Sequence, residues 1–586
     1  MERGRRGGGT VLAIGVFAGA ALSIYGARRR LIARWLGLPP ARHGVAVERG
    51  LVVPMSDGAI LKADHYSPKG RGSFPTILLR TPYGRGSDLP SPLGIVVAFQ
   101  HRLVAARGYH VVAQTVRGRF DSGGRFNPFF DEADDGRATL KWLRGQPWFD
   151  GALGMMGQSY LGYVQWAAAS EDPDTVRALV PHITASHLDS LVYPDGAFGL
   201  DLALRWISTL DTLGGATKNS AWSIVRRLNP AALERRLAPA FGRLPLREAD
   251  TAAVDQPVSY YHDWLAHPDL GDPYWRSIDH RSSVVRTSAP VHLVGGWYDI
   301  FLRAQLADYA RLRDAGRAPY LTVGPWWHSD GRGGRAALRE TLIWGEAYLK
   351  GNPSLLRRQP VRLYVMGADA WRDLESWPPP ARETPYFLQE AGGLSPAPPA
   401  TETPPDHYHY DPADPTPSVG GPLLFSPPAG PRDNRALEAR ADVLLYTTPP
   451  LTADLEMIGP VRLDLYVRSS LEHTDFFGRV CDVHPDGRSI NICDGLLRLE
   501  PGTGNGAPRP DGSRRITVDL WATAHRFARG HRLRLQVSSG AHPRWSRNLG
   551  TGEPIATGTA MAAADQTVYH DRAHPSALIL PVALSV

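Results

Sequence analysis

The chain has 586 residues, of which 43% are hydrophobic and 21% are charged, a balance that excludes disordered and collagen-like classes. This length predicts several hydrophobic cores instead of one. The formal net charge is +7, but residues 1–50 hold nine arginines against two glutamates, which accounts for the whole surplus. Because the rest of the chain is neutral, no nucleic acid is expected as a partner.

Residues 7–27 carry no charge and have arginines on both sides. This length suits a single membrane span or signal anchor better than a short cleaved signal peptide, the alternative being an Ala/Gly-rich tail. We therefore predict a membrane anchor or signal segment at residues 1–40, and a protein that is membrane-associated through this single N-terminal segment, or exported. Arginines on both flanks leave the orientation open.

After the anchor, strand and helix patterns alternate. Residues 51–66 predict a β-hairpin, and the short apolar runs at 76–79, 110–113 and 153–156 predict buried strands, with helical spacing at 131–144. Further strands are expected at 291–294 and 320–323, before a closing helix at 334–349. This alternation predicts a mainly parallel sheet covered by helices on both faces, formed by residues 45–184 and 286–353.

Residues 157–162 read Gly-Gln-Ser-Tyr-Leu-Gly between an apolar run and a helix-like run. This pattern is typical of a nucleophile elbow, in which a serine on a tight strand-to-helix turn exposes its hydroxyl. Gly157 and Gly162 leave room for the turn. Ser159 is therefore the predicted nucleophile, with a helix-capping serine as the alternative.

Residues 185–285 interrupt the alternation with apolar positions at helical spacing, such as Leu202, Trp206, Leu210 and Leu213, followed by a second set that starts at Trp222. The distance from Ser159 to the next expected catalytic strand is much longer than one strand-helix-strand unit needs, which takes about 30 residues. We predict an inserted helical cap here.

Residues 354–586 are rich in Pro, Gly and short β patterns, including 361–365, 463–467, 516–520 and 533–537. They predict a C-terminal all-β jelly-roll sandwich, with 377–422 as a long surface connection. Cys481 and Cys493 flank an expected hairpin turn at Gly487, and either a cross-strand disulfide or two buried thiols fits this placement. The chain has no zinc-binding cysteine spacing.

An elbow serine needs a base and an orienting acid, which on this fold follow it in the order acid, then histidine. Asp299 follows the strand predicted at 291–294, and His328 follows the one at 320–323. Since the carboxyl ends of parallel strands meet at one edge, we expect Ser159, Asp299 and His328 to form a catalytic triad.

The triad predicts acyl transfer, in which His328 takes the proton of Ser159 and Asp299 holds the imidazole. The backbone N–H of Tyr160 is the first expected oxyanion donor. Tyr83 is the second, because its phenol is protonated at neutral pH. This chemistry requires neither a metal nor a cofactor.

Several motifs together resemble the CocE/NonD family of serine hydrolases, which includes cocaine esterase, α-amino-acid ester hydrolase and bacterial Xaa-Pro dipeptidyl-peptidase-like enzymes. The matching segments are 54–58, 80–83, 117–124, 146–148, 157–162, 296–299, 324–328, 530–535 and 547–548. The resemblance implies an α/β-hydrolase body with an inserted helical cap and a jelly-roll domain. It also implies Ser159, Asp299 and His328 as the triad, with Tyr83 and Tyr160 as the oxyanion hole.

The substrate is predicted to be a carboxylic acyl ester, with amides as a further class. Residues 300–302, directly after Asp299, are apolar, whereas family members that act on α-amino-acid esters have acidic residues there to hold the ammonium. One alternative is an Xaa-Pro dipeptidyl-peptidase, with Asp195 or Glu171 to hold the free N-terminus. The other is a non-catalytic protein that binds through its β-sandwich. The aromatic residues predicted to line the substrate pocket are Trp166, Phe198, Phe301 and Trp327, and Trp206 is a further aromatic residue that suits an apolar acyl group.

Overall fold

The computed structural model describes residues 33, 36–90, 93–169, 172, 175–214, 229–425, 428–502 and 506–584. The uncharged stretch at 7–27, on which the predicted anchor depends, lies outside these ranges. So do Glu171 and the second set of cap residues that starts at Trp222. Over the part that is described, no helix combines the length and the apolar character needed to cross a membrane.

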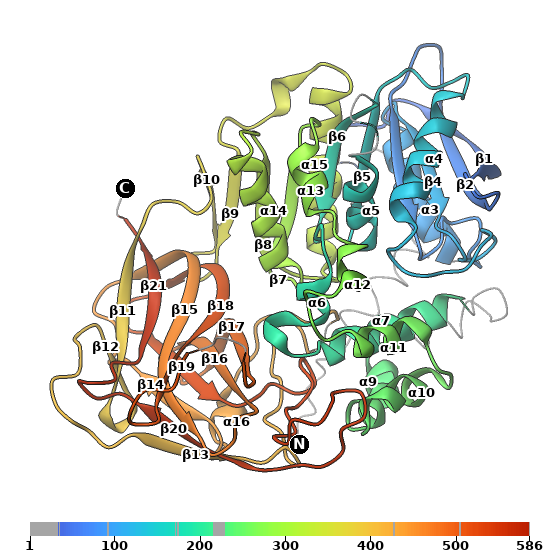
Figure 1. The fold of residues 1–586 in the computed structure, drawn as a ribbon. Coiled ribbons are helices and arrows are strands. Elements are labelled where there is room, and N and C mark those ends of the chain that lie inside the picture. Colours follow the sequence, from blue (N-terminus) through green and yellow to red (C-terminus); the bar gives the residue numbers. More distant parts are fainter. Residues whose placement is uncertain are drawn as a thin grey trace, which may run out of the picture.

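A ten-stranded sheet forms the first part of the molecule (Figure 1). Its strands, in spatial order, are β1 (Gly44–Pro54), β2 (Ile60–Lys69), β4 (His110–Thr115), β3 (Thr76–Thr81), β5 (Leu153–Gln158), β6 (Val176–His182), β7 (His292–Tyr298), β8 (Tyr320–Trp327), β9 (Val361–Val365) and β10 (Ala370–Leu374). The predicted hairpin is confirmed, because β1 pairs with β2 in antiparallel fashion. From β4 to β9 neighbouring strands run parallel, as the alternation predicted.

Successive residues of one strand pack into two different cores. Ile77 and Leu79 of β3 belong to one cluster with Val104 and Leu338, whereas Leu78 belongs to another with Leu140. Neighbouring residues of a strand point to opposite faces, so helices cover both sides of the sheet. The covering helices are α3 (Leu93–Ala105) and α15 (Gly331–Tyr348) on the first face, with α4 (Glu132–Arg144), α5 (Tyr160–Ala169) and α14 (Leu302–Asp314) on the second.

One predicted strand joins a different sheet from the one expected. The pattern at 361–365 was predicted to begin the all-β domain, but β9 instead lies parallel to β8 and extends the first sheet. Val361, Leu363 and Val365 are fully buried in the core of that sheet. Strand propensity alone does not say which sheet a strand joins, since pairing depends on long-range contacts.

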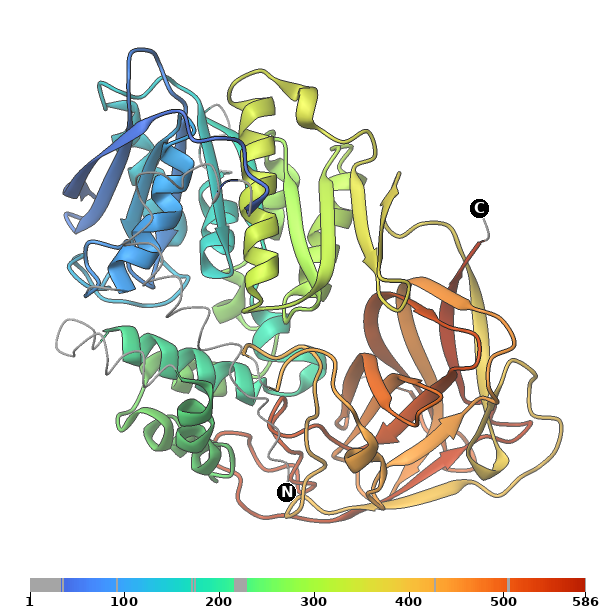
Figure 2. The same cartoon turned by 180° about the vertical axis from the view of Figure 1, so that it is seen from behind.

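Residues 189–286 contain helices and no strand among those described. These helices are α6 (Asp189–Val192), α7 (Leu200–Gly214), α9 (Pro230–Phe241), α10 (Ala249–Val254), α11 (Ser259–Ala266), α12 (Pro273–Arg276) and α13 (Arg281–Arg286), with 3₁₀ turns at Pro194–Gly196 and Leu246–Glu248. Figures 1 and 2 show α7, α9, α10 and α11 together below one end of the sheet. This helical character agrees with the predicted cap.

The C-terminal part is all-β, as predicted, and its strands form a second hydrogen-bonded sheet. The strands are β11 (Ala381–Gln389), β12 (Gly393–Ser395), β13 (Asp406–Tyr410), β14 (Leu444–Thr447), β15 (Leu455–Ser469), β16 (Thr474–Val483), β17 (Ser489–Leu499), β18 (Arg514–Phe527), β19 (Arg532–Ser538), β20 (Ala564–Tyr569) and β21 (Ala577–Ala583). A short helix, α16 (Arg435–Glu438), and a 3₁₀ turn at Glu390–Gly392 also lie in this part, whereas the 3₁₀ turn at Pro353–Leu355 lies between α15 and β9. The segment 377–422 is not a mere surface connection, because β11, β12 and β13 pair with β21, β14 and β20. The jelly-roll connectivity itself remains a prediction.

The loop between β19 and β20 ties the all-β domain to the cap. The backbone N–H of Asp201 in α7 donates to the carbonyl of Pro543 at 2.9 Å, and the N–H of Ser546 donates to Phe198 at 2.7 Å. Arg547 Nη2 donates to the carbonyl of Gly242 at 2.8 Å. Three separate points of the cap are therefore attached to one C-terminal loop.

Cys481 and Cys493 are both free and buried. They lie on paired strands of the β16–β17 hairpin, but Val480 is the residue that faces Cys493, and Cys481 faces Asn491. Of the two possibilities that the sequence left open, the structure has buried thiols. Burial raises the pKa of the Cys493 thiol well above its ordinary value, so both sulfurs behave as small apolar groups.

Candidate active site

Ser159 occupies the turn between β5 and α5. Its φ of 58° lies in the left-handed region, which a non-glycine residue adopts only when its surroundings hold it there. The backbone N–H of Ser159 donates to the carbonyls of His182 and Ile183 at 3.0 and 3.2 Å, and the Thr184 hydroxyl donates to the Ser159 carbonyl at 2.8 Å. The end of β6 thus supports the turn that was predicted from the hexapeptide.

Two glycines make this turn possible. Gly157 has a φ of 144°, and a Cβ there would lie 2.4 Å from Cβ of Leu161. A Cβ at Gly162 would lie 2.4 Å from Cγ2 of Thr184. Both separations are far below van der Waals contact, so the close approach of strand and helix requires glycine at both positions.

Asp299 and His328 meet as their order in the chain predicted. Asp299 follows β7, His328 follows β8, and β7 pairs directly with β8. The Nδ1 atom of His328 lies 2.8 Å from Oδ2 of Asp299, while Oδ1 of the same carboxylate accepts from the N–H of Phe301 at 2.8 Å. Because a carboxylate only accepts, Nδ1 carries a proton, and in the neutral imidazole Nε2 is then the nitrogen with a free lone pair.

Apart from Asp299, two rings close to His328 bear no charge. The Phe301 ring packs 5.5 Å from the His328 ring, measured between centroids. Burial, together with the nearby His328, lowers the pKa of His182 to about 3, so His182 is neutral at physiological pH. Within the described residues Ser159 and His328 do not form a hydrogen bond, and in serine hydrolases without substrate this contact is often long.

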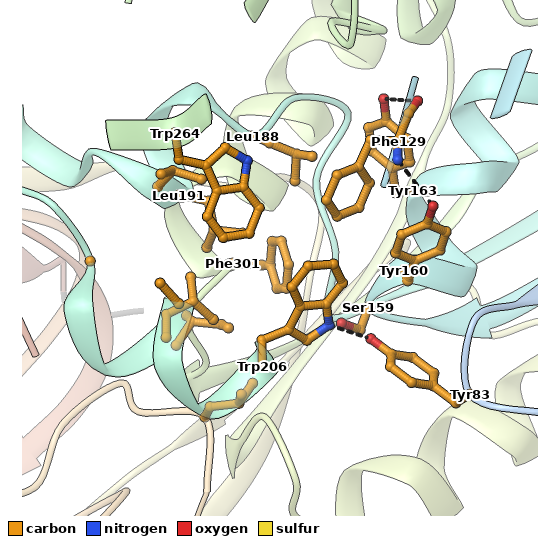
Figure 3. A pocket seen from close by; sticks show the side chains of 16 residues that line it. Tyr83, Phe129, Ser159, Tyr160, Tyr163, Leu188, Leu191, Trp206, Trp264 and Phe301 are labelled. Atoms are coloured by element: carbon orange, nitrogen blue, oxygen red, sulfur yellow. Dashed lines mark hydrogen bonds between the residues drawn. The ribbon is translucent and has the colours of Figure 1, made fainter. Parts of the chain in front are cut away.

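Tyr83 follows β3 and places its hydroxyl beside that of Ser159 (Figure 3). Trp206 Nε1 donates to the Tyr83 oxygen at 2.9 Å, so the phenolic proton remains available for a second partner. Burial raises the pKa of Tyr83, and hydrogen bonds with Trp206 and Ser159 offset part of the rise. The phenol therefore stays protonated at neutral pH and can donate to an oxyanion.

Tyr160 is the first residue of α5. The N–H groups of Gly162 and Tyr163 both donate to the Ser159 carbonyl, whereas the first N–H of a helix has no intrahelical acceptor. The Tyr160 side chain is directed elsewhere: its hydroxyl donates to Glu132 Oε1 at 2.7 Å. Only the backbone of Tyr160 is thus available beside the nucleophile, as the sequence predicted.

A pocket opens directly in front of Ser159 (Figure 3) and contains about 630 Å³ of empty space, part of it open to solvent. Its walls come from the body, the cap and the all-β domain. The described residues that line it include no Asp, Glu, Lys, Arg or His. The lining residues are Tyr83, Phe129, Ser159, Tyr160, Tyr163, Leu188, Leu191, Val192, Gly199, Leu202, Ala203, Trp206, Trp264, Ile300, Phe301 and Leu424.

Of the four aromatic residues predicted to line the pocket, only Phe301 does so. Trp166 and Phe198 have no exposed surface and belong to hydrophobic cores. Trp327 packs against Gly430, with the Arg332 guanidinium 5.6 Å from its ring. An aromatic side chain near a catalytic motif can serve packing equally well, and the sequence cannot tell the two roles apart.

Most residues of the pocket wall were not predicted from the sequence, including Trp264 from α11 and Leu424 from the all-β domain. Neither residue lies near a catalytic motif in the sequence. Trp206, which the sequence offered as a further aromatic residue for the acyl group, does line the pocket from α7. Ile300 and Phe301, which the sequence analysis singled out as apolar residues after Asp299, both line the pocket.

The described residues contain one group of side chains with metal-ligand spacing. Atoms of Asp482, His484 and His531 lie within 4.8 Å of one another in the all-β domain. Hydrogen bonds already account for this group: Asp482 bonds to His531 at 2.8 Å and to His525 at 3.0 Å. None of the four residues lines the Ser159 pocket.

An α/β-hydrolase-like body with a serine on an elbow, and an Asp–His pair at the carboxyl ends of neighbouring strands of the same sheet, has the arrangement of a serine hydrolase. Comparisons with known proteins agree. A family model for X-Pro dipeptidyl-peptidase (S15 family) matches residues 57–330, and one for the X-Pro dipeptidyl-peptidase C-terminal non-catalytic domain matches residues 356–579. Cocaine esterase of Rhodococcus sp. (strain MB1 Bresler) is 34% identical over 577 residues, covering 92% of this chain and 98% of that protein.

Two solved structures share the whole architecture. An aminopeptidase from a marine sediment archaeon, Thaumarchaeota archaeon, has a TM-score of 0.77 at 22% identity, covering 92% of this chain and 96% of that one. An α-amino acid ester hydrolase has a TM-score of 0.75 at 22% identity, covering 92% and 97%. At this identity they establish the fold. Together with the relative above, these findings show that the chain belongs to the CocE/NonD family of serine hydrolases and acts on esters.

Proposed function

We propose that Ser159, Asp299 and His328 form the catalytic triad and that ester cleavage passes through an acyl-enzyme on Ser159. His328 Nε2 takes the hydroxyl proton as Ser159 attacks the ester carbonyl, and it then returns that proton to the leaving alcohol. Water attacks the acyl-enzyme in the same way and releases the acid. Asp299 stabilises the imidazolium that forms in each half of the reaction, with the 2.8 Å contact to Nδ1 as its support.

The same proposal assigns the oxyanion hole to the Tyr83 hydroxyl and the Tyr160 N–H. The Tyr83 hydroxyl comes from the loop that follows β3, and the Tyr160 N–H comes from the start of α5, directly after Ser159. A phenol and a backbone amide are neutral hydrogen-bond donors that the fold holds in place before the reaction begins. They therefore stabilise the charge that develops on the carbonyl oxygen in the transition state more than they stabilise the neutral ester.

The Tyr83 assignment predicts that Tyr83→Phe lowers kcat by roughly 100- to 1000-fold with a small change in KM, because the lost hydrogen bond forms mainly in the transition state. Steady-state kinetics with a p-nitrophenyl ester would measure both constants. Tyr364→Phe is the matched control, since its hydroxyl only contacts the exposed Asp369 at 3.3 Å. Full kcat in Tyr83→Phe would remove this residue from the oxyanion hole.

We further propose that the preferred substrates are esters whose acyl group is uncharged and apolar, including aromatic acids. The observation that carries this proposal is the pocket: Ser159 faces walls of aliphatic and aromatic side chains without a described ionisable acid or base other than tyrosine. An ammonium group placed there would lose its hydration without gaining a counter-charge. The name of the relative, cocaine esterase, supports ester cleavage as the main reaction.

The Xaa-Pro dipeptidyl-peptidase alternative has less support. Of the two acids considered as anchors for a free N-terminus, Asp195 forms an ion pair with Arg303 and does not line the pocket. Glu171 lies outside the described residues. The S15 family model describes the fold that both activities share, so the choice between them depends on the pocket.

A matched pair of substrates tests this preference. Methyl phenylacetate and phenylglycine methyl ester differ in one ammonium group, and we expect kcat/KM to be at least about 100-fold higher for the first. Ala-Pro p-nitroanilide is expected to react more slowly than p-nitrophenyl butyrate. Equal or better turnover of the ammonium ester or of the anilide would contradict the proposed specificity.

For the N-terminus we propose a membrane anchor or export signal at residues 1–40, supported by the uncharged stretch at 7–27. We expect the full chain to sediment with membranes and to be released by detergent but not by high salt, or to be found outside the cytoplasm. A chain that begins at residue 41 is the control and should do neither. A full chain that behaves as this shortened one would contradict the proposal.

A further inference from the structure

A second cavity adjoins the Ser159 pocket where the cap, the body and the all-β domain meet. It contains about 390 Å³ of empty space, part of it open to solvent. Leu191, Gly199, Leu202 and Ile300 line both cavities and form the partition between them. The remaining residues that line the second cavity are Ser190, Pro194, Asp201, Pro422, Leu423, Trp521, Arg544 and Trp545.

Four polar atoms that belong to residues lining this cavity are buried and have no hydrogen-bond partner in the described part of the chain. They are Nη2 of Arg544, Nε1 of Trp521, Nε1 of Trp545 and Oδ2 of Asp201. The exposed fractions of these residues are only 6%, 8%, 1% and 2%, in the same order. Because native proteins satisfy nearly all buried polar groups, four unsatisfied groups around one cavity indicate that something polar fills it.

The charges around the cavity are already balanced. Arg544 pairs through Nη1 with Asp494, which also pairs with Arg479, and Nη2 of Arg544 has no partner. Asp201 accepts through Oδ1 from Nε of Arg205 at 2.5 Å, and Oδ2 has no partner. Because Arg205 also pairs with Glu234, three arginines face three carboxylates. A charged ligand would therefore bring an uncompensated charge into a buried site, whereas a neutral polar group would not.

The unsatisfied atoms also define the hydrogen bonds that a ligand must make. Three of them are N–H donors, from Arg544, Trp521 and Trp545, and the fourth is a carboxylate oxygen that accepts. A hydroxyl group donates and accepts at once, and a carbonyl oxygen accepts two bonds. A neutral group with hydroxyl or carbonyl oxygens thus matches the wall, and an alkyl chain does not.

The position of these side chains is strongly constrained. Trp521 has a φ of 66°, which is costly for a residue with a bulky side chain, and its backbone N–H donates to Oδ1 of Asp519 at 2.7 Å. The Arg544 guanidinium lies over the rings of Trp545 and Trp521, 4.0 and 5.1 Å from their centroids. Backbone strain that the fold maintains is concentrated at functional sites, which supports a binding role for Trp521.

We propose that the second cavity receives a neutral, hydroxyl- or carbonyl-bearing end of a substrate whose ester group lies at Ser159. This inference rests on the proposed function of Ser159 and adds the substrate class: esters with such a group several bonds from the scissile carbonyl. The substrate passes the partition of Leu191, Leu202 and Ile300 and reaches the donors of Arg544, Trp521 and Trp545.

The test compares esters that differ only at the remote end. One series has p-nitrophenyl esters of ω-hydroxy acids against n-alkanoates with the same number of heavy atoms, and the other has butyrate monoesters of diols against butyrates of alkanols. An apolar pocket alone disfavours a hydroxyl at every length, because the hydroxyl loses its hydration. If the second cavity binds the hydroxyl group, one series shows the opposite preference. At one chain length we expect kcat/KM of the hydroxyl ester to be roughly tenfold higher than that of the alkyl ester.

Two conservative substitutions connect this preference to the cavity. Trp521→Phe and Trp545→Phe keep an aromatic ring but remove the N–H, and each should reduce the hydroxyl-to-alkyl ratio by roughly threefold to tenfold. Trp371→Phe is the control, since Trp371 is 44% exposed on β10 and lines neither cavity, and it should leave the ratio unchanged. Thermal unfolding of each variant would show that the fold is retained.

The outcomes separate this inference from the proposed function. A preference for the alkyl ester at every length in both series would overturn the second binding site, while alkyl ester turnover would still support the role of Ser159. Faster turnover of an ω-carboxy or ω-amino ester than of the hydroxy ester would contradict the inference that the group bound in the second cavity is neutral. A hydroxyl preference that both tryptophan variants keep in full would place the binding group elsewhere and also contradict the proposal.

Discussion

Replacing Ser159 by alanine is expected to abolish labelling by a fluorophosphonate probe and to lower kcat for p-nitrophenyl esters by about six orders of magnitude. The probe forms a bond only with an activated serine, and no other side chain of the pocket can take the place of the lost hydroxyl. Residual hydrolysis would come from binding and the oxyanion donors, which act on water as the nucleophile.

Ser159→Ala should leave the fold intact. The contacts that hold the turn are made by the Ser159 backbone, through the carbonyls of His182 and Ile183 and the hydroxyl of Thr184. Circular dichroism and thermal unfolding would check this, and Ser354→Ala, a substitution in an exposed 3₁₀ turn, serves as the control for the labelling experiment. Labelling of Ser159→Ala at the rate of the unmodified protein would contradict the assignment of the nucleophile.

Replacing Asp299 by asparagine is expected to lower kcat at neutral pH by about four orders of magnitude. Oδ1 accepts from the N–H of Phe301 at 2.8 Å, and an amide oxygen can keep that bond. The amide NH₂ would then face Nδ1 of His328, which must become an acceptor. The ring proton moves to Nε2, so the base can no longer accept the Ser159 proton.

Asn and Asp have nearly the same shape, so Asp299→Asn changes the position of one proton and leaves the side-chain packing in place. We expect the thermal unfolding midpoint of Asp299→Asn to stay close to that of the unmodified protein while kcat falls. Asp330→Asn is the matched control: Asp330 caps α15 by accepting from the N–H of Arg332 at 2.9 Å, and asparagine caps helices equally well. Comparable kcat in the two variants would argue against a role for Asp299.

Much of the body and of the site was predictable because it depends on local sequence. The elbow around Ser159 is encoded by glycines at 157 and 162, which are needed for space whatever the rest of the chain does. Asp299 and His328 each follow a short apolar strand, and the rule that parallel strands end at one edge was sufficient to bring them together. The 2.8 Å contact between them agrees with that expectation.

The errors share a different origin. The strand β9 was assigned to the wrong sheet, and three of the four predicted pocket aromatics proved to pack elsewhere, because both questions depend on which distant segments meet. Trp166 is the clearest case. It lies seven positions after Ser159 on α5, yet it faces the core under the sheet, while Leu424 from the all-β domain reaches the pocket.

The amino-acid sequence by itself determined the chemistry of this protein, because a strained turn, a base and an acid each have strong local signatures. Only the tertiary structure decided what surrounds that chemistry. The apolar wall before Ser159 and the unsatisfied polar atoms beyond Ile300 arise where three parts of the chain pack against one another. Burial and the loss of hydration are properties of that packing, so no single segment of sequence contains them.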